Sequence, residues 1–124
     1  MSTKKKILIV EDDEFLLSMY STKFEIEGYE VVIAANGEEG VEKSRNSNPD
    51  IILLDIMLPQ MDGFDVLKKI KASRETNSIP VILLTNLSQK QDVEQGLSLG
   101  ADDYLVKAHF MPSEVVDKIK RLIK

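Results

Sequence analysis

Five short apolar runs recur along the chain, separated by longer stretches of mixed polarity. Within each run, apolar residues follow one another instead of alternating with polar ones, which is typical of strands buried on both faces. Such strands occur in parallel sheets that are covered by helices. The five predicted strands are Ile7–Val10, Val31–Ala34, Ile51–Leu54, Val81–Leu84 and Tyr104–Val106.

The stretches between these runs space their apolar residues as amphipathic helices do. The first helix is predicted over Glu14–Glu27 and ends at Gly28. Its apolar face is predicted to consist of Phe15, Leu16, Met19, Tyr20 and Phe24. Later helices are predicted over Gly37–Asn46, from Gly63 through Ile70, over Ser88–Leu99 with Val93 and Leu97 inward, and from Pro112 onward.

Strands that alternate with helices indicate βαβ units, right-handed crossovers and a parallel sheet, which is an α/β fold. No linker, low-complexity tract or fixed-period repeat interrupts the alternation. Residues 1–124 are therefore expected to form one domain, and no further output domain is expected.

The composition narrows the class of protein. With 43% hydrophobic and 30% charged residues, the chain has the balance of a folded globular protein. Its net charge of −5 argues against nonspecific nucleic-acid binding, which needs a basic surface. The lack of cysteine and the single histidine exclude disulfides, thiolate zinc sites and multi-histidine metal sites. No apolar run is long enough for an export signal or a membrane span, so a cytoplasmic location is expected.

Acidic residues follow two of the predicted strands. Glu11 and Asp12 come directly after the first run, and Asp55 comes directly after the third. Ligand sites of parallel sheets lie beyond the carboxyl ends of the strands, so these carboxylates are expected at one edge of the sheet. Crowded carboxylates repel one another unless a cation joins them, and Mg²⁺ is the expected cation.

Two more strand ends carry side chains suited to phosphate chemistry. Thr85 follows the fourth run, and Lys107 follows the fifth. The carboxylate of Asp55 can attack phosphorus to form an acyl phosphate. A threonine hydroxyl can donate a hydrogen bond to a phosphoryl oxygen, and a lysine ammonium can pair with a carboxylate or with phosphate. The set predicts a phosphoryl-transfer site.

In this order and spacing, the residues resemble the receiver domains of bacterial two-component response regulators. The resemblance covers about Lys6 to Lys124 and rests on Glu11-Asp12, the segment Asp55–Gly63, Thr85 and Tyr104–Lys107. It implies a chemotaxis-regulator-like fold, which is a flavodoxin-like (βα)5 doubly wound parallel sheet with strand order 2-1-3-4-5.

The resemblance also implies roles for the site residues. Asp55 would accept a phosphoryl group in a step that needs Mg²⁺, and Lys107 would assist this transfer. Asp12, Asp55 and the backbone carbonyl of Met57 would bind the metal, with Glu11 acting through a water molecule. The protein would be phosphorylated in this way without being a turnover enzyme.

Thr85 would also assist the transfer, and Thr85 and Tyr104 would form a switch pair. The pair would report phosphorylation to the surface made by the fourth helix, the fifth strand and the fifth helix. The implied partners are a sensor histidine kinase or a histidine phosphotransfer protein and a separate effector protein. No direct contact with nucleic acid and no membrane insertion are expected. Homodimerisation through the switch surface, and whether the chain is a stand-alone protein or an excised receiver, are left open.

Three other functions share parts of this pattern. A phosphatase of the haloacid dehalogenase type needs a second aspartate two residues after the nucleophile, and this position is Met57. A flavodoxin binds a phosphate in the loop after the first strand, where the segment 11–14 is entirely acidic and would repel it. A receiver that serves as a constitutive binding module would lack part of the acidic pair, the aspartate or the lysine, and all of these are present.

Two positions depart from the family pattern. Lys107 is followed by Ala108, where the family usually has a proline that is often joined by a cis bond. A cis bond before a residue other than proline costs about 2.5–4 kcal/mol, so this bond is expected to be trans. Asn86 follows Thr85 in place of the usual small residue, and its amide would either limit access or add a hydrogen bond.

The positions two residues beyond Asp55 and Thr85 predict a long-lived phosphoryl group. They are Met57 and Leu87, which should flank the mouth of the site, and their apolar side chains cannot orient a water molecule for hydrolysis. We expect the double variant Met57→Asn, Leu87→Glu to lose its phosphoryl group faster than the wild type, as followed by intact mass over time. An unchanged rate would refute this explanation.

Overall fold

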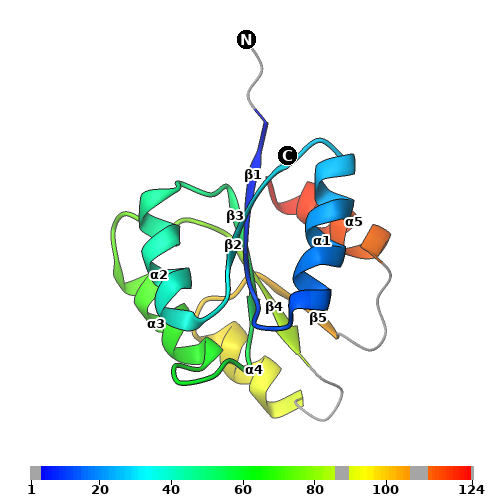
Figure 1. Ribbon diagram of the computed structural model, residues 1–124. Coiled ribbons are helices and arrows are strands. Elements are labelled where there is room, and N and C mark those ends of the chain that lie inside the picture. Colours follow the sequence, from blue (N-terminus) through cyan, green and yellow to red (C-terminus); the bar gives the residue numbers. More distant parts are fainter. Residues whose placement is uncertain (1–3, 86–89, 107–111, 124) are drawn as a thin grey trace.

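The computed structural model describes residues 4–85, 90–106 and 112–123 (Figure 1). Its strands are β1 Lys6–Val10, β2 Glu30–Ala34, β3 Ile51–Asp55, β4 Val81–Thr85 and β5 Asp103–Val106. Its helices are α1 Glu14–Ile26, α2 Gly37–Asn46, α3 Gly63–Ala72, α4 Lys90–Ser98 and α5 Pro112–Ile123. Every expected strand and helix is present, in the expected order.

The five strands form one parallel sheet in the order β2-β1-β3-β4-β5. This confirms the α/β fold class and the flavodoxin-like strand order. The central strands β3 and β4 are buried at every position, because helices cover both faces of the sheet. The uninterrupted apolar runs of the sequence therefore correspond to strands that are buried on both faces.

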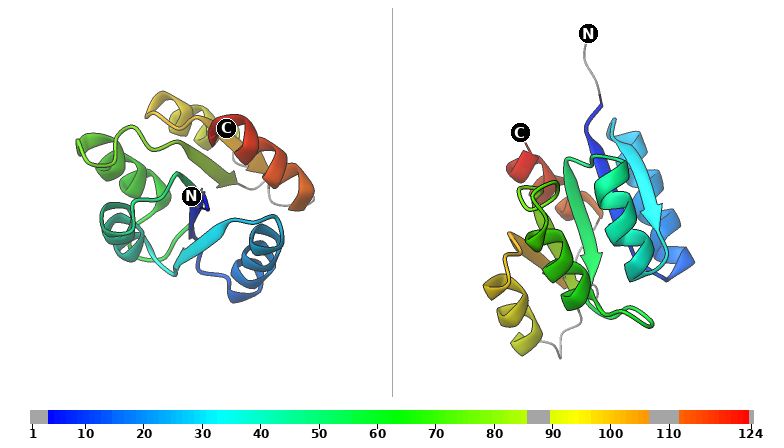
Figure 2. Two further views of the ribbon diagram at one scale, coloured as in Figure 1. Left: turned by 90° about the horizontal axis from the view of Figure 1, so that it is seen from above. Right: turned by 90° about the vertical axis from the view of Figure 1, so that its left-hand side faces the viewer.

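Helices α1 and α5 cover one face of the sheet, and α2, α3 and α4 lie on the other (Figures 1 and 2). Residues on each strand alternate between two separate cores. In β1, Ile7 and Ile9 pack toward α1 and α5, whereas Leu8 and Val10 pack toward α2 and α3. Among the described residues, no helix is both long enough and apolar enough to cross a membrane.

The expected apolar face of α1 is partly wrong. Phe15 is 74% exposed, and the buried residues of the helix are Leu17, Tyr20 and Phe24. These three recur at helical spacing along one line, and Phe15 lies about 200° around the helix from Leu17. Phe15 is thus an apolar residue on the side of α1 that faces away from the sheet.

Leu97 in α4 is also more exposed than expected. The helix turns Val93 and Gly96 toward the sheet, and Leu97 is 40% exposed. Gly96 lies directly on β4, where a Cβ atom would overlap the side chain of Leu83. Because Gly96 has no side chain, α4 can pack closely on the sheet. The spacing of apolar residues in the sequence does not predict this contact.

Gly63 allows α3 to begin directly against the end of β3. A Cβ atom here would lie 2.6 Å from the Cα of Ile56 and closer still to the carbonyl oxygen of Asp55, and backbone atoms cannot turn aside. We expect Gly63→Ala to lower the free energy of unfolding by roughly 2–3 kcal/mol in urea denaturation, as overpacking does.

Gly28→Ala is the matched control for this substitution. Nothing lies within 4 Å of a Cβ atom at Gly28, so its cost, about 1 kcal/mol, comes only from the positive φ of 95°. Equal losses of stability in the two variants would contradict the steric explanation.

Candidate functional site

The parallel register brings the polar ends of the central strands together. Asp55 is the last residue of β3, and Val10, the residue before Glu11, pairs with Leu54. Glu11 therefore stands beside Asp55 at the carboxyl edge of the sheet. On the other side of β3, Thr85 ends β4 at the same edge.

Three carboxylates gather at this edge. Glu11, Asp12 and Asp55 each offer an oxygen, and these oxygens all lie within 4.8 Å of one another. Glu11 and Asp55 are almost completely buried, whereas Asp12 is exposed. The expectation that the acidic residues of the first and third strand ends meet at one edge is confirmed. All-oxygen donors at this spacing fit a hard divalent cation such as Mg²⁺, which would neutralise the cluster and polarise a phosphoryl group.

Backbone N–H groups orient two of the three carboxylates. Oδ1 of Asp55 accepts a hydrogen bond from the N–H of Met57 at 3.0 Å, and Oε1 of Glu11 accepts one from the N–H of Asp13 at 3.1 Å. The N–H of Glu11 donates to the carbonyl of Ala34 at 3.0 Å and so extends the ladder between β1 and β2 past the end of the strand. The sheet and the turns that follow it therefore fix both side chains.

Two other acidic residues near the site cap helices. Asp13 is the N-cap of α1, where its Oδ1 accepts the N–H groups of Phe15 and Leu16. Asp62 is the N-cap of α3 and accepts the N–H of Asp65 at 3.0 Å. Asp62-Gly63 is therefore the junction between the β3–α3 loop and α3. These caps hold the two loops that border the carboxylate cluster.

A cleft of about 560 Å³ opens beside the cluster. Its wall combines acidic and apolar side chains from the β1–α1 loop, the β3–α3 loop and the start of helices α3 and α4, namely Asp12, Ile56, Met57, Leu58, Pro59, Asp62, Phe64 and Asp92. Met57 is 59% exposed, so an apolar side chain stands at the mouth, as expected. Lys107, Asn86, Leu87 and Ala108 lie outside the described residues.

Thr85 and Tyr104 lie on the same side of the sheet. Thr85 is buried at the end of β4, and Tyr104 on β5 pairs with Leu83, two residues earlier on β4. Because side chains two apart on a strand share a face, both residues are turned toward the α4 side. Tyr104 is 39% exposed and follows Asp103, which pairs with Lys118 of α5 at 2.9 Å. The shared side of the sheet is compatible with the predicted switch pair, whose function stays a prediction.

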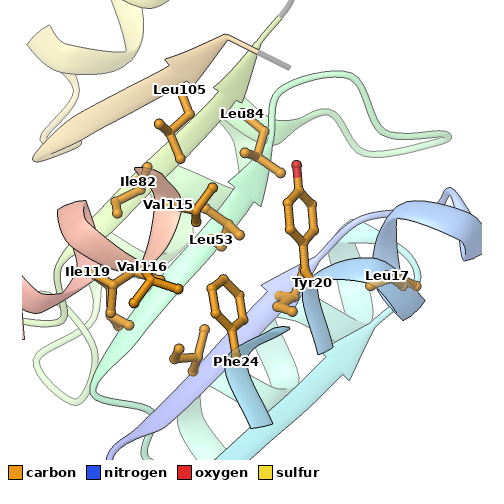
Figure 3. Close-up of a cluster of buried hydrophobic side chains, with 13 residues drawn as sticks. Leu17, Tyr20, Phe24, Leu53, Ile82, Leu84, Leu105, Val115, Val116 and Ile119 are labelled. Carbon is orange, nitrogen blue, oxygen red and sulfur yellow. The ribbon is translucent and has the colours of Figure 1, made fainter. Parts of the chain in front are cut away.

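The sequence predicts Tyr20 as a core residue of α1, and in the structure its ring lies in that core (Figure 3), where two carboxylates of the site also act on it electrostatically. Tyr20 is fully buried, and this burial raises the pKa of its hydroxyl well above the usual range, with further contributions from the charges of Glu11 and Asp55. The sequence contains one indication of this relation. The hydroxyl of Tyr20 is a polar group within an otherwise apolar helical stripe, about two turns after the acidic segment 11–14.

Comparison with known proteins places this fold and site in a family. Residues 7–120 match the response regulator receiver domain family. The alkaline phosphatase synthesis transcriptional regulatory protein of Bacillus subtilis is 38% identical over 120 residues, which are 97% of this chain and 49% of the relative. The chain spans about half the length of the curated relatives that it matches.

Solved receiver domains share the structure over almost the whole chain. A putative response regulator from Chloroflexus aurantiacus superposes with a TM-score of 0.91 at 32% identity, covering 98% of both chains. The receiver domain of a sensor histidine kinase from Pseudomonas aeruginosa, which has a magnesium ion in its active-site cleft, superposes with a TM-score of 0.89 at 30% identity, again covering 98% of both chains. The chain belongs to the response regulator receiver domain family, whose members are phosphoacceptor domains of two-component signalling.

Divalent metal should stabilise the folded protein through the carboxylate cluster. At ten times its dissociation constant, Mg²⁺ should raise the free energy of unfolding by about 1.4 kcal/mol, because it binds the folded state alone. We expect Asp12→Asn to lose most of this increase in thermal unfolding with and without Mg²⁺. Asp62→Asn is the control, since asparagine also caps helices and Asp62 is not among the three clustered carboxylates. An equal loss in both variants would contradict the assignment.

Proposed function

We propose that Asp55 is the phosphoacceptor of this receiver domain and that its phosphorylation controls the binding of a partner protein. The observation that carries the proposal is the position of Asp55 itself. It is a buried carboxylate that ends the central strand β3, beside Glu11 and Asp12 and next to an open cleft.

The chemistry follows from a phosphohistidine donor placed in that cleft. A carboxylate oxygen of Asp55 attacks phosphorus, the P–N bond to the imidazole breaks, and its electron pair returns to the ring nitrogen. The products are an acyl phosphate on Asp55 and a free histidine on the donor. The backbone N–H of Met57 holds Oδ1 of Asp55 at 3.0 Å, which orients the carboxylate before the attack.

Negative charge is the main obstacle to this transfer. The incoming phosphoryl oxygens meet three carboxylates whose ligand atoms lie within 4.8 Å of one another. We infer that Asp12 and Asp55 bind Mg²⁺ with the backbone carbonyl of Met57, and that Glu11 contributes through a water molecule. A bound Mg²⁺ would supply the positive charge that offsets the repulsion between carboxylate and phosphoryl oxygens. The ammonium group of Lys107 is expected to pair with a phosphoryl oxygen, and this role stays a prediction.

The output is assigned to the surface of α4, β5 and α5. The Thr85 hydroxyl donates to a phosphoryl oxygen on Asp55, and Thr85 and Tyr104, which lie on the same side of the sheet, act as the switch pair. Phosphorylation thereby shifts an equilibrium between two forms of that surface. The register that relates Thr85 to Tyr104 supports the pairing.

The partners follow from this chemistry. The phosphodonor is a sensor histidine kinase or a histidine phosphotransfer protein, and the acceptor of the signal is a separate protein, with no direct binding to nucleic acid. The domain acts as a switch and not as a turnover enzyme. The expectation of a single domain over residues 1–124 stays a prediction, since the curated relatives are about twice as long.

Phosphorylation of Asp55 can be tested by intact mass after treatment with acetyl phosphate. We expect the wild type to gain the mass of one phosphoryl group in the presence of Mg²⁺ and to gain none when the metal is chelated. Asp55→Asn should gain none under either condition, because an amide is not a nucleophile toward phosphorus.

Asp50→Asn is the control for the loss of a carboxylate elsewhere. Asp50 lies at the opposite edge of the sheet, where its side chain accepts the N–H of Lys6. The Asp50→Asn variant should therefore gain the mass of one phosphoryl group in the presence of Mg²⁺, as the wild type does. If the wild type gains no mass although it is folded, the phosphoacceptor proposal fails, and a binding module that works without phosphorylation becomes the better assignment.

A further inference from the structure

Strand β2 forms one edge of the described sheet, with β1 as its neighbour (Figure 2). Backbone groups of successive strand residues point alternately to the two sides, so half of those on an edge strand lack a strand partner. The N–H of Glu30 and the carbonyl of Ala34 bond to residues that flank β1. The N–H and C=O groups of Val31 and Ile33 therefore point outward, away from β1.

The outer edge of β2 is apolar as well as open. The strand reads Glu-Val-Val-Ile-Ala, with β-branched residues at its centre, and the side chain of Ile33 is 45% exposed. An open apolar strand is a template for pairing with another chain, and proteins commonly protect such edges with a charged side chain, lysine above all. A protecting group is therefore expected beside β2.

The side chain of Lys43, on α2, lies against this edge. Its Nζ donates a hydrogen bond to the outward carbonyl of Ile33 at 2.5 Å and pairs with Oε1 of Glu39, one turn earlier in α2, at 3.1 Å. A hydrogen bond from an ionised donor is stronger than one between neutral groups. A second strand that competes for the Ile33 carbonyl must therefore displace a charged donor.

The outer edge of β2 is also complementary to itself. In an antiparallel pair of β2 strands with Val32 on the two-fold axis, Val31 of each copy faces Ile33 of the other. Each such pair exchanges both of its N–H···O bonds, which satisfies the outward backbone groups of both strands. The exchange needs the Ile33 carbonyl as an acceptor, and this is the atom that Lys43 occupies. Lys43 must therefore leave in both copies before the strands can pair.

We propose that the outer edge of β2 is a strand-pairing surface for a second copy of this chain, and that the ammonium group of Lys43 keeps this surface closed. The pairing would join two sheets through their β2 strands. In the strand order, β2 and β5 stand at opposite edges, so the surface is separate from that of α4, β5 and α5. The inference does not depend on the phosphorylation of Asp55.

Lys43→Met tests the role of the ammonium group, because methionine keeps most of the unbranched apolar stem and removes the charged donor. In sedimentation equilibrium of the unphosphorylated protein, we expect the dimer dissociation constant of Lys43→Met to be roughly tenfold or more below that of the wild type. Lys43→Arg should behave as the wild type, since a guanidinium group also donates to a carbonyl. Equal association of Lys43→Met and the wild type would overturn the inference, and so would equal association of Lys43→Arg and Lys43→Met.

Lys68→Met is the matched control. Lys68 is an exposed lysine of α3, a helix on the same face of the sheet as α2. Its replacement changes the net charge by the same amount and introduces the same side chain without altering the edge of β2. The variant should associate no more than the wild type does. Association as strong as that of Lys43→Met would indicate a general effect of charge or of an added methionine, and the inference would fail.

A cysteine at position 32 tests the place and register of the contact. The chain contains no cysteine, so a single one reports one position. Across the proposed axis the two residues 32 form a pair without mutual hydrogen bonds, whose Cα atoms lie about 4.5 Å apart, within reach of a disulfide.

We expect Val32→Cys combined with Lys43→Met to form a disulfide-linked dimer under mild oxidation, as seen on a non-reducing gel. Val32→Cys alone should form much less of it at the same concentration, because Lys43 still closes the edge. A Lys43→Met protein that dimerises in sedimentation, without a faster disulfide through position 32, would place the contact elsewhere and overturn the inference.

Discussion

Repulsion between carboxylates at one edge of the sheet is the constraint on which this site depends. Glu11, Asp12 and Asp55 come close enough to share one cation, and two of them are nearly excluded from solvent. Like charges in such a place are stable only if dipoles, hydrogen bonds or a cation compensate them. The same charges that repel one another in the cluster would give it affinity for a metal and for a metal-bound phosphoryl group.

The surrounding fold is organised to hold these charges in position. The parallel register aligns the ends of β1, β3 and β4, and the helix caps Asp13 and Asp62 anchor the two loops that border the cluster. Gly63 lets α3 start against the end of β3 without steric overlap.

Sequence reasoning was most successful where one physical rule acts alone. Apolar runs typical of strands buried on both faces predict the five strands of the sheet, and the rule that ligands bind at its carboxyl edge predicts from the sequence that Glu11, Asp12 and Asp55 meet there. It was wrong for Phe15 and Leu97, which belong to apolar stretches but point toward solvent. Leu97 lies beside the buried stripe of α4, which is about 100° wide, and so fits the pattern without reaching the core. Phe15 lies nearly opposite the buried line of α1, so its apolar character alone does not indicate burial.

The sequence by itself determined the strands, the helices and the kinds of atom available at the sheet edge, because these depend on local periodicity and on residue type. Only the tertiary structure decided which face of each helix is buried and that Gly96 brings α4 onto Leu83. These features depend on distances between residues far apart in the chain. Such distances are set by how the layers pack, and no local pattern encodes them.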